Sequence, residues 1–321
     1  MPNFTAASPG KVILVGEHAV VYGEPALALP VQAVKARAVI SPLLDGPEGR
    51  ILLEAPDVGL ASSLDNLREN HPLQVIVSGL QKELNLQRFP SCRIQITSTI
   101  PIASGFGSGA AVSAAVARAL AGFVGKTLSL KQLSALTYEV EKIHHGTPSG
   151  IDNTVVVYEK PIYFTKDKPF EIIRIPESFT LVIGYSGIQG PTHQSVKLVR
   201  DGWKKDPLRS ETLFAFIGDI SRQTRRLIEN GSPLDIGPLL DENHRLLQKL
   251  NVSIPEIDHL VESARTAGAL GAKLSGAGLG GNIIALVDND NGKAIQQALL
   301  NAGAEQVFIT TIPATPTNAR A

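Results

Sequence analysis

Residues 101–111, Pro-Ile-Ala-Ser-Gly-Phe-Gly-Ser-Gly-Ala-Ala, place three glycines between a strand-like run and a run of small helix formers. Glycine adopts backbone conformations that other residues avoid, so such a cluster indicates a tight loop or a close approach of the backbone to a ligand. Gly105, Gly107 and Gly109 leave backbone N–H groups unobstructed, and a following helix adds unpaired donors and the positive end of its dipole. The segment therefore predicts an anion-binding loop. The structural alternative is a tight turn before a close-packed helix.

A second glycine cluster, at residues 273–281, contains the spacing G-x-G-x-x-G at Gly276, Gly278 and Gly281. In a dinucleotide-binding fold this spacing follows a strand and opens a helix. Here the next residues, 282–287, are Asn-Ile-Ile-Ala-Leu-Val, an apolar run that is typical of a strand. The cluster therefore predicts a glycine-rich hairpin or loop that closes over the first cluster, and not a dinucleotide site.

A third segment, residues 9–23, places polar side chains at both ends of an apolar strand. Lys11 precedes the run Val-Ile-Leu-Val, and Glu17 and His18 follow it. Polar groups in these positions indicate a functional site. Taken singly, a solvent-facing lysine and a hydrogen-bonded turn histidine are the alternatives.

A fourth segment, residues 141–153, carries two carboxylates that are eleven positions apart. Pro148 and Gly150 are expected to end a helix and to force a turn that presents Asp152. Glu141 sits at the helix end, so the two acids can face one site from different elements. One could hold Mg²⁺ while the other handles a substrate proton, which is the division that phosphoryl transfer requires. The alternative for Asp152 is a capping residue.

Hydrophobic periodicity predicts a chain of mixed helix and strand content. Apolar residues recur at three- to four-residue spacing over 130–143, which predicts a helix with one core-facing stripe and with Glu141 off that stripe. Further helices are expected over 113–120, 209–230, 238–250, 257–267 and 292–301. Strands are expected over 12–15, 94–100, 172–175, 180–184, 282–287 and 306–312.

The length of 321 residues favours two domains. A polar, lysine-rich stretch at residues 160–169 is the expected boundary, so we divide the chain into domains 1–165 and 166–321. The tail, residues 313–321, carries two prolines and few apolar residues, and we expect it to fray.

Composition excludes several classes of protein. A hydrophobic share of 43% and a balance of 30 basic against 30 acidic residues predict a folded globular chain. The zero formal net charge lacks the positive field of a nucleic-acid-binding protein. With no basic leader and no run of about 18 apolar residues, we expect a cytoplasmic protein without a membrane partner. The single cysteine, Cys92, cannot form an internal disulfide.

In this order and spacing, the four segments resemble the GHMP kinase superfamily, which includes galactokinases, homoserine kinases, mevalonate kinases and phosphomevalonate kinases. Residues 9–23 are similar to the first motif of the mevalonate kinases almost residue for residue, and residues 145–153 are similar to their catalytic segment. Residues 104–111 resemble the ATP phosphate loop of the superfamily, and residues 273–281 resemble the third motif that supports it.

The resemblance implies an α+β fold of two domains with the active site in the cleft between them. The N-terminal domain would be like ribosomal protein S5 domain 2, and the C-terminal domain would be ferredoxin-like. The implied reaction transfers the γ-phosphate of ATP to the 5-hydroxyl of mevalonate, a step in making isoprenoid precursors, with Mg²⁺ as cofactor. The implied partners are mevalonate and ATP, and a homodimer is one possible assembly.

The resemblance also assigns roles by position. Asp152 would take the hydroxyl proton or orient that group, and Lys11 would pair with Asp152 and stabilise the developing negative charge. Glu141 falls at the Mg²⁺ ligand of the family. The residues assigned to the ATP phosphates are Pro101, Ala103, Ser104, Gly105, Phe106, Gly107, Ser108, Gly109, Ala110 and Ala111. The residues assigned to mevalonate are Glu17, His18, Ser149, Thr192, Gly276 and Ala277.

The sequence departs from the family pattern in two segments. The family's phosphate loop reads Gly-Ser-Ser, and Gly109 stands where the second serine helps to bind Mg²⁺. Mg²⁺ would then depend on Glu141, phosphate oxygens and water. Tyr185 and His193 replace an aspartate and a lysine. The alternatives are a related kinase that acts on phosphomevalonate or on the 3-hydroxyl of mevalonate, and a sensor that binds these ligands without turnover.

Overall fold

The computed structural model describes residues 3–44, 47–101, 104–145, 148–190, 192–288 and 290–316. It contains two compact units, and each unit is built from three separate segments of the chain. The first unit comprises Met1–Lys11, Pro30–Ile102 and Gly107–Glu159, and the second comprises Val12–Leu29, Ala103–Phe106 and Lys160–Ala321. The units are defined by contacts, and the division at residue 165 stays a prediction.

One sheet has the strand order β4-β3-β5-β2-β6-β7, and β1 pairs with β2. Its strands are β1 (Phe4–Val15), β2 (Ala26–Pro42), β3 (Ile51–Ala55), β4 (Leu60–Ser63), β5 (Cys92–Ser98), β6 (Ile162–Phe164) and β7 (Glu171–Ile172). β3 is parallel to β5, whereas β2 is antiparallel to both β5 and β6. Buried and exposed side chains alternate along β5, because one face of this strand packs on the core.

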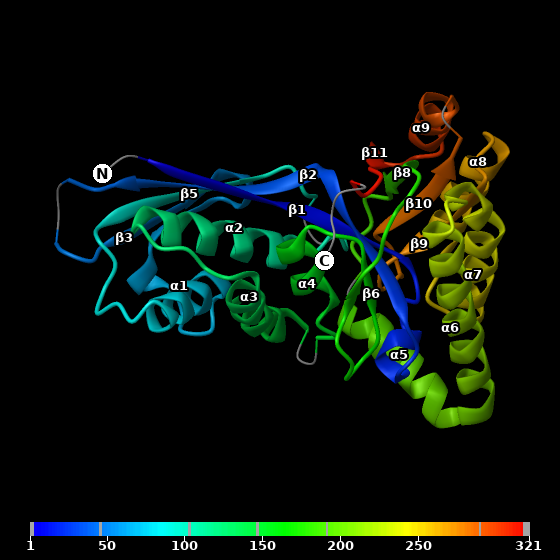
Figure 1. Ribbon diagram of the computed structural model, residues 1–321, viewed down its shortest axis with the longest axis horizontal. Coiled ribbons are helices and arrows are strands. Elements are labelled where there is room, and N and C mark those ends of the chain that lie inside the picture. Colours follow the sequence, from blue (N-terminus) through cyan, green and yellow to red (C-terminus); the bar gives the residue numbers. More distant parts are fainter. Residues whose placement is uncertain are drawn as a thin grey trace. The chain divides into compact units, whose positions relative to one another are not determined.

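The described residues of the first unit form four α-helices, α1 (Pro72–Glu83), α2 (Ser108–Phe123), α3 (Leu130–His145) and α4 (Ile151–Tyr158). α2 contacts the other three helices and β5 (Figure 1). Most of its residues are buried, and most of those are alanines. Such small side chains let neighbouring elements approach α2 closely from several sides. The helix expected over 113–120 is confirmed, and it begins five residues earlier than expected.

The buried face of α3 differs from the predicted stripe. Leu133 and Val140 are buried as expected, but Leu130 and Ile143, at the two ends of the stripe, are 45% and 38% exposed. Glu141, expected off the stripe, is buried. The prediction is wrong for Glu141 because α3 contacts α1, α2 and α4, so its buried face is wider than one apolar stripe.

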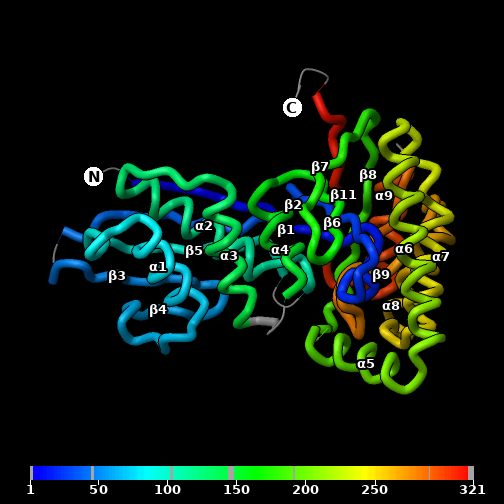
Figure 2. Tube along the Cα trace, turned by 60° about the horizontal axis from the view of Figure 1, so that its bottom comes forward, coloured from blue at the N-terminus to red at the C-terminus, as the bar shows by residue number. Residues whose placement is uncertain are grey.

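The second unit contains an antiparallel sheet with the order β11-β8-β10-β9. Its strands are β8 (Phe179–Tyr185), β9 (Gly271–Ser275), β10 (Asn282–Val287) and β11 (Gln306–Ile312). Its helices are α5 (Thr192–Lys205), α6 (Pro207–Glu229), α7 (Gly237–Lys249), α8 (Pro255–Thr266) and α9 (Gly292–Asn301). α7 and α8 pack on β9, and α9 packs on β8 and β11. Figure 2 shows α6 and α7 running alongside each other.

Sequence expectations for this unit are confirmed where the apolar pattern is local. The ranges 282–287, 292–301 and 306–312 match β10, α9 and β11 in full. The strand expected over 172–175 is wrong beyond Ile172, where β7 ends.

The chain near the C-terminus is held in place at Thr315, so the expectation of a frayed tail is wrong at this residue. The Thr315 N–H donates to the Ile175 carbonyl at 2.7 Å, and the Thr315 hydroxyl accepts from the Ile175 N–H at 2.9 Å. The rest of the expected frayed tail, residues 317–321, lies outside the described residues.

Within the described ranges, no helix is long and apolar enough to cross a bilayer. The cytoplasmic location and the homodimer stay predictions.

Candidate active site

Lys11 of β1 and Asp152 of α4 form an ion pair inside the first unit. The distance from Lys11 Nζ to Asp152 Oδ1 is 3.1 Å, and the two side chains are 6% and 23% exposed. A charge this deeply buried is costly unless an opposite charge lies beside it. The structure therefore brings together the two residues that were predicted to be catalytic.

The predicted end of the helix before Asp152 is confirmed, because α3 ends at His145 and a second helix, α4, begins at Ile151, with Asp152 in its first turn. Gly150 precedes the helix with a φ of 91°, in the left-handed region that favours glycine. The Ser149 hydroxyl accepts from the Ile151 N–H at 3.4 Å, in the first turn of the helix. A carboxylate in this position interacts favourably with the helix dipole. The segment therefore places the Asp152 carboxylate at the N-terminus of a short helix. This helix was not predicted, because Pro148 and Gly150 before it are typical of a turn.

Gly107 connects the phosphate loop to this ion pair. It precedes α2 with a φ of 73°, and a Cβ added there would lie 3.0 Å from Lys11 Cγ and 3.7 Å from Asp152 Oδ2. Only glycine fits this position without displacing the lysine. Ser108, Gly109, Ala110 and Ala111 open α2. The Ala111 N–H donates to the Gly107 carbonyl at 3.0 Å, whereas the N–H groups before it in a first helical turn lack intrahelical partners. Those earlier donors lie next to the ion pair, as an anion-binding loop requires.

The preceding loop residues belong to the second unit, where they meet the β9–β10 hairpin. Asn282 Nδ2 donates to the Ser104 carbonyl at 2.6 Å, and a Cβ added to Gly281 would lie 3.2 Å from the same oxygen. Phe106 is buried edge-on against Phe308, with ring centroids 5.7 Å apart. The predicted glycine-rich hairpin over the first cluster is confirmed. Asn282 was missed because its role depends on a partner far away in the sequence.

Pro101, Ala103 and Gly105 were also predicted to bind the ATP phosphates. Pro101 is half-buried, and Gly105 is exposed with a φ of 85°. Ala103 lies outside the described residues.

His18 is buried beside the hairpin, where its Nε2 lies 2.9 Å from the Ala277 carbonyl oxygen. A carbonyl only accepts, so Nε2 carries the proton and donates. The pKa of His18 is lowered to about 4, chiefly by burial; the bond to Ala277 opposes this shift and the charge of Lys273 adds to it. The imidazole is therefore neutral at pH 7, with Nδ1 unprotonated.

Glu17 pairs with Lys273, and both side chains are buried. Lys273 Nζ donates to Glu17 Oε1 and to the Leu274 carbonyl, the latter at 2.5 Å. Burial lowers the pKa of Lys273. The other carboxylate oxygen of Glu17 has no hydrogen-bond partner in the described part of the chain. Lys273 was not among the predicted site residues, although a single charge within the small and apolar run of β9 was a signal for it.

Thr192 begins α5, whose first turns contact the glycine hairpin. The Ser195 hydroxyl donates to the Gly278 carbonyl at 3.3 Å. Gly276 has a φ of 100° and open space where a Cβ would be. Thus Glu17, His18, Thr192, Gly276 and Ala277 belong to the second unit, whereas Ser149 belongs to the first. Of the two departures near Thr192, Tyr185 is buried at the end of β8 and His193 is exposed.

Glu141 is the predicted metal ligand. It is buried on α3, which packs against α2 and α4, the helices that carry Ser108 and Asp152. Among the described residues, no group of three or more His, Cys, Asp and Glu side chains could hold a metal ion. Mg²⁺ is usually held by one or two carboxylates together with phosphate oxygens and waters. A buried carboxylate in the unit that carries Gly107 and the start of α2 fits this chemistry.

Comparison with known proteins agrees with this geometry. The family models for the GHMP kinases N terminal domain and the GHMP kinases C terminal match residues 70–160 and 224–305. The mevalonate kinase of Pyrococcus furiosus is 33% identical over 303 residues, or 88% of this chain and 89% of that protein. The chain belongs to the mevalonate kinases of the GHMP kinase family.

Solved structures of this family share the fold over nearly the whole chain. The L. major mevalonate kinase in complex with R-mevalonate matches with a TM-score of 0.84 at 27% identity, covering 98% of this chain and 97% of that one. The Methanococcus jannaschii mevalonate kinase also has a TM-score of 0.84, at 26% identity, covering 98% and 99%. The predicted α+β fold of the GHMP kinases is confirmed.

Proposed function

We propose that this chain transfers the γ-phosphoryl group of ATP to the 5-hydroxyl of mevalonate, giving 5-phosphomevalonate and ADP. The observation that carries the proposal is the Lys11–Asp152 ion pair, packed against Gly107 at the start of α2. Relatives named mevalonate kinase span most of the chain, and one solved relative contains R-mevalonate. Both findings support mevalonate as the acceptor.

In the proposed reaction, the 5-hydroxyl oxygen bonds to the γ-phosphorus, and the bond between that phosphorus and the β–γ bridging oxygen breaks. Asp152 takes the hydroxyl proton, and ADP leaves. The Lys11 ammonium holds the Asp152 carboxylate in place and stabilises the negative charge that develops on the attacking oxygen. The backbone N–H groups at the start of α2 hold phosphate oxygens.

Mg²⁺, held by Glu141, phosphate oxygens and water, would neutralise charge on the transferred phosphate. Mevalonate would bind Glu17, His18, Ser149, Thr192, Gly276 and Ala277. Because Nε2 of His18 donates to Ala277, its Nδ1 is an acceptor at pH 7. This protonation state supports a contact from His18 to a mevalonate hydroxyl, since a carboxylate has no proton to donate.

The test is ADP release by the purified protein with ATP and Mg²⁺, in the presence of mevalonate, phosphomevalonate, galactose or homoserine. Of these four compounds, we expect only mevalonate to be phosphorylated. The ³¹P–¹H coupling in the NMR spectrum of the product should place the phosphate on C5. Phosphate on the 3-hydroxyl, or faster turnover of phosphomevalonate, would assign a different kinase. Turnover no faster with mevalonate than without it would indicate a binding protein without catalysis.

A further inference from the structure

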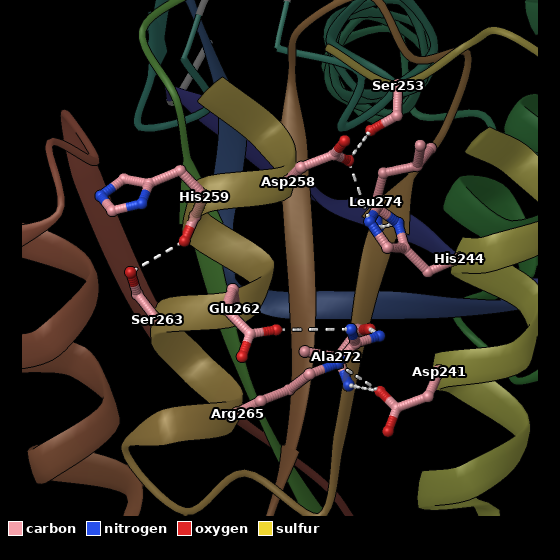
Figure 3. A network of polar contacts seen from close by, with 10 residues as sticks. All are labelled: Asp241, His244, Ser253, Asp258, His259, Glu262, Ser263, Arg265, Ala272 and Leu274. Atoms are coloured by element: carbon pink, nitrogen blue, oxygen red, sulfur yellow. Dashed lines mark hydrogen bonds and ion pairs between the residues drawn. The ribbon is translucent and has the colours of Figure 1, made fainter. Parts of the chain in front are cut away.

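In the described part of the chain, β9 is an edge strand of the antiparallel sheet β11-β8-β10-β9. Such an edge presents backbone N–H and C=O groups that need other partners. Here side chains of α7 and α8 supply them (Figure 3). Asp241 Oδ1 accepts from the Ala272 N–H at 2.9 Å, and His244 Nδ1 accepts from the Leu274 N–H at 3.3 Å. Arg265 donates to the Ala272 carbonyl at 2.9 Å. The edge of β9 is therefore held by helices instead of a fifth strand.

Asp258 lies beside His244, within ion-pair distance but without hydrogen-bond geometry. The Nε2 of His244 lies 3.1 Å from Asp258 Oδ1, and the Ser253 hydroxyl donates to the same oxygen at 2.5 Å (Figure 3). Since Nδ1 accepts from Leu274, the ring proton lies on Nε2, toward the carboxylate. The His244 side chain is 2% exposed, and burial is the chief cause that lowers its pKa to about 4, against the effect of Asp258. A neutral, oriented acceptor thus faces the strand.

β9 and the loop that follows it carry contacts to β1 and to the turn that holds Glu17 and His18. Lys273 and Ser275 of β9 make two of these contacts, and Ala277 of the loop makes the third. Lys273 pairs with Glu17, and the Ala277 carbonyl accepts from His18. The Ser275 hydroxyl accepts from the Ile13 N–H at 3.1 Å and donates to the Ile13 carbonyl at 2.9 Å. Any shift of β9 would therefore move the groups that hold the proposed mevalonate-binding turn.

Resting on the proposed function, we propose that His244 is a positioning residue for mevalonate binding. By accepting from the Leu274 N–H, His244 fixes β9 against α7, and β9 with the loop that follows it fixes Glu17 and His18. Without this acceptor the Leu274 N–H would be buried and unpaired, which favours displacement of the strand. His244 acts through the strand and need not touch substrate or ATP.

The test compares His244→Leu, which removes the acceptor, with His244→Asn, whose Oδ1 can take the place of Nδ1. We expect His244→Leu to raise the KM for mevalonate by about tenfold or more while the KM for ATP stays within about twofold. His244→Asn should stay within about threefold of the wild type for both substrates. Ser263→Ala is the matched surface control, because Ser263 bonds only to the His259 carbonyl of its own helix in the described network. It should behave as wild type.

A second readout does not depend on the substrate. Hydrogen exchange of backbone amides at residues 271–277 should be faster in His244→Leu and near wild type in His244→Asn. This readout tests the edge contact even if the wild type fails to phosphorylate mevalonate, which would overturn the proposed function by itself. Leu299→Ala removes a buried side chain of α9 and controls for general loss of stability.

Three results would overturn the role of His244. The first is an unchanged mevalonate KM and unchanged exchange in His244→Leu. The second is an equal rise of the KM values for mevalonate and ATP in that variant. The third is equal impairment of the His244→Asn and His244→Leu variants. If His244→Leu fails to fold, Asp258→Asn provides the test, because it removes the charge that faces Nε2 of the ring. We then expect a rise in mevalonate KM of about threefold. An unchanged KM in that variant would also overturn the proposal.

Discussion

Lys11 Nζ lies 3.1 Å from Asp152 Oδ1, and the backbone of Gly107 packs against both residues. The three residues come from β1, from α4 and from the start of α2, so segments far apart in the sequence meet at this point. A fixed ammonium beside a proton-accepting carboxylate, next to free helix N–H groups, suits transfer of an anionic group.

Substitution of Gly107 by alanine should lower kcat more than its effect on stability explains. The new Cβ would lie 3.0 Å from Lys11 Cγ and displace the ion pair. Lys11 would have to move by a few tenths of an ångström, and we expect this shift to lower kcat by about tenfold. Gly125→Ala is the matched control, because Gly125 also has a positive φ, 68°, but no neighbour within 4 Å. Both variants should lose about 1–2 kcal/mol from backbone strain. Equal kcat values in the two variants would contradict the account.

The buried Glu17–Lys273 pair should show strong coupling in stability. Lys273→Met leaves the Glu17 carboxylate buried without its cation, which should cost about 3–5 kcal/mol in the free energy of unfolding. The double variant Glu17→Gln, Lys273→Met removes both charges and should recover a large part of that loss. Urea unfolding of the two single variants and the double variant measures the coupling. Additive losses would show that the two side chains do not depend on each other.

Stability should fall as the pH is lowered from 6.5 to 4, in part because of His18. Its pKa is about 4 in the folded chain against 6.5 for an unperturbed histidine. In this range the unfolded chain binds a proton that the folded chain does not bind, so low pH favours unfolding. This residue alone should cost about 2 kcal/mol between pH 7 and pH 5. His18→Gln keeps a donor for Ala277 but does not titrate, so its stability should fall about 2 kcal/mol less over the same range. Identical pH dependence in both proteins would rule out the neutral, buried state of His18.

Substitution of Gly109 by serine should increase the apparent affinity of the protein for Mg²⁺. It restores the hydroxyl that the family's phosphate loop carries and adds an oxygen ligand near the start of α2. The free Mg²⁺ concentration at half-maximal velocity should therefore fall a few-fold, while the KM for mevalonate stays unchanged. Gly109→Ala controls for the added Cβ. A serine variant that matches the alanine variant would show that Mg²⁺ does not bind near position 109.

Much of the fold could be predicted where a local apolar run decides the element. β10, β11 and α9 match their expected ranges because their patterns are strong and bounded by turn residues. The expected strand over 172–175 failed because Ile175 pairs with Thr315, a contact 140 residues away, instead of joining the sheet. The buried position of Glu141 was missed because packing by three helices widened the buried face of α3.

The site shows the same division between local and long-range information. The motifs identified Lys11, Asp152 and the phosphate loop, since these residues lie in dense local patterns. Lys273 and Asn282 could not be assigned in this way, because each takes its role from one distant partner, Glu17 and Ser104. The short helix that carries Asp152 in its first turn was not predicted, because Pro148 and Gly150 before it are typical of a turn.

The most direct test of the central claim is the turnover of Asp152→Asn with ATP, Mg²⁺ and mevalonate, measured as ADP release beside the wild type. Asparagine keeps the shape of the side chain but cannot take the hydroxyl proton. We expect kcat to fall by about 10²–10⁴-fold, with the Kd for ATP within about twofold of the wild type. A variant that retains kcat within about tenfold of the wild type would contradict the assignment of the proton transfer to Asp152.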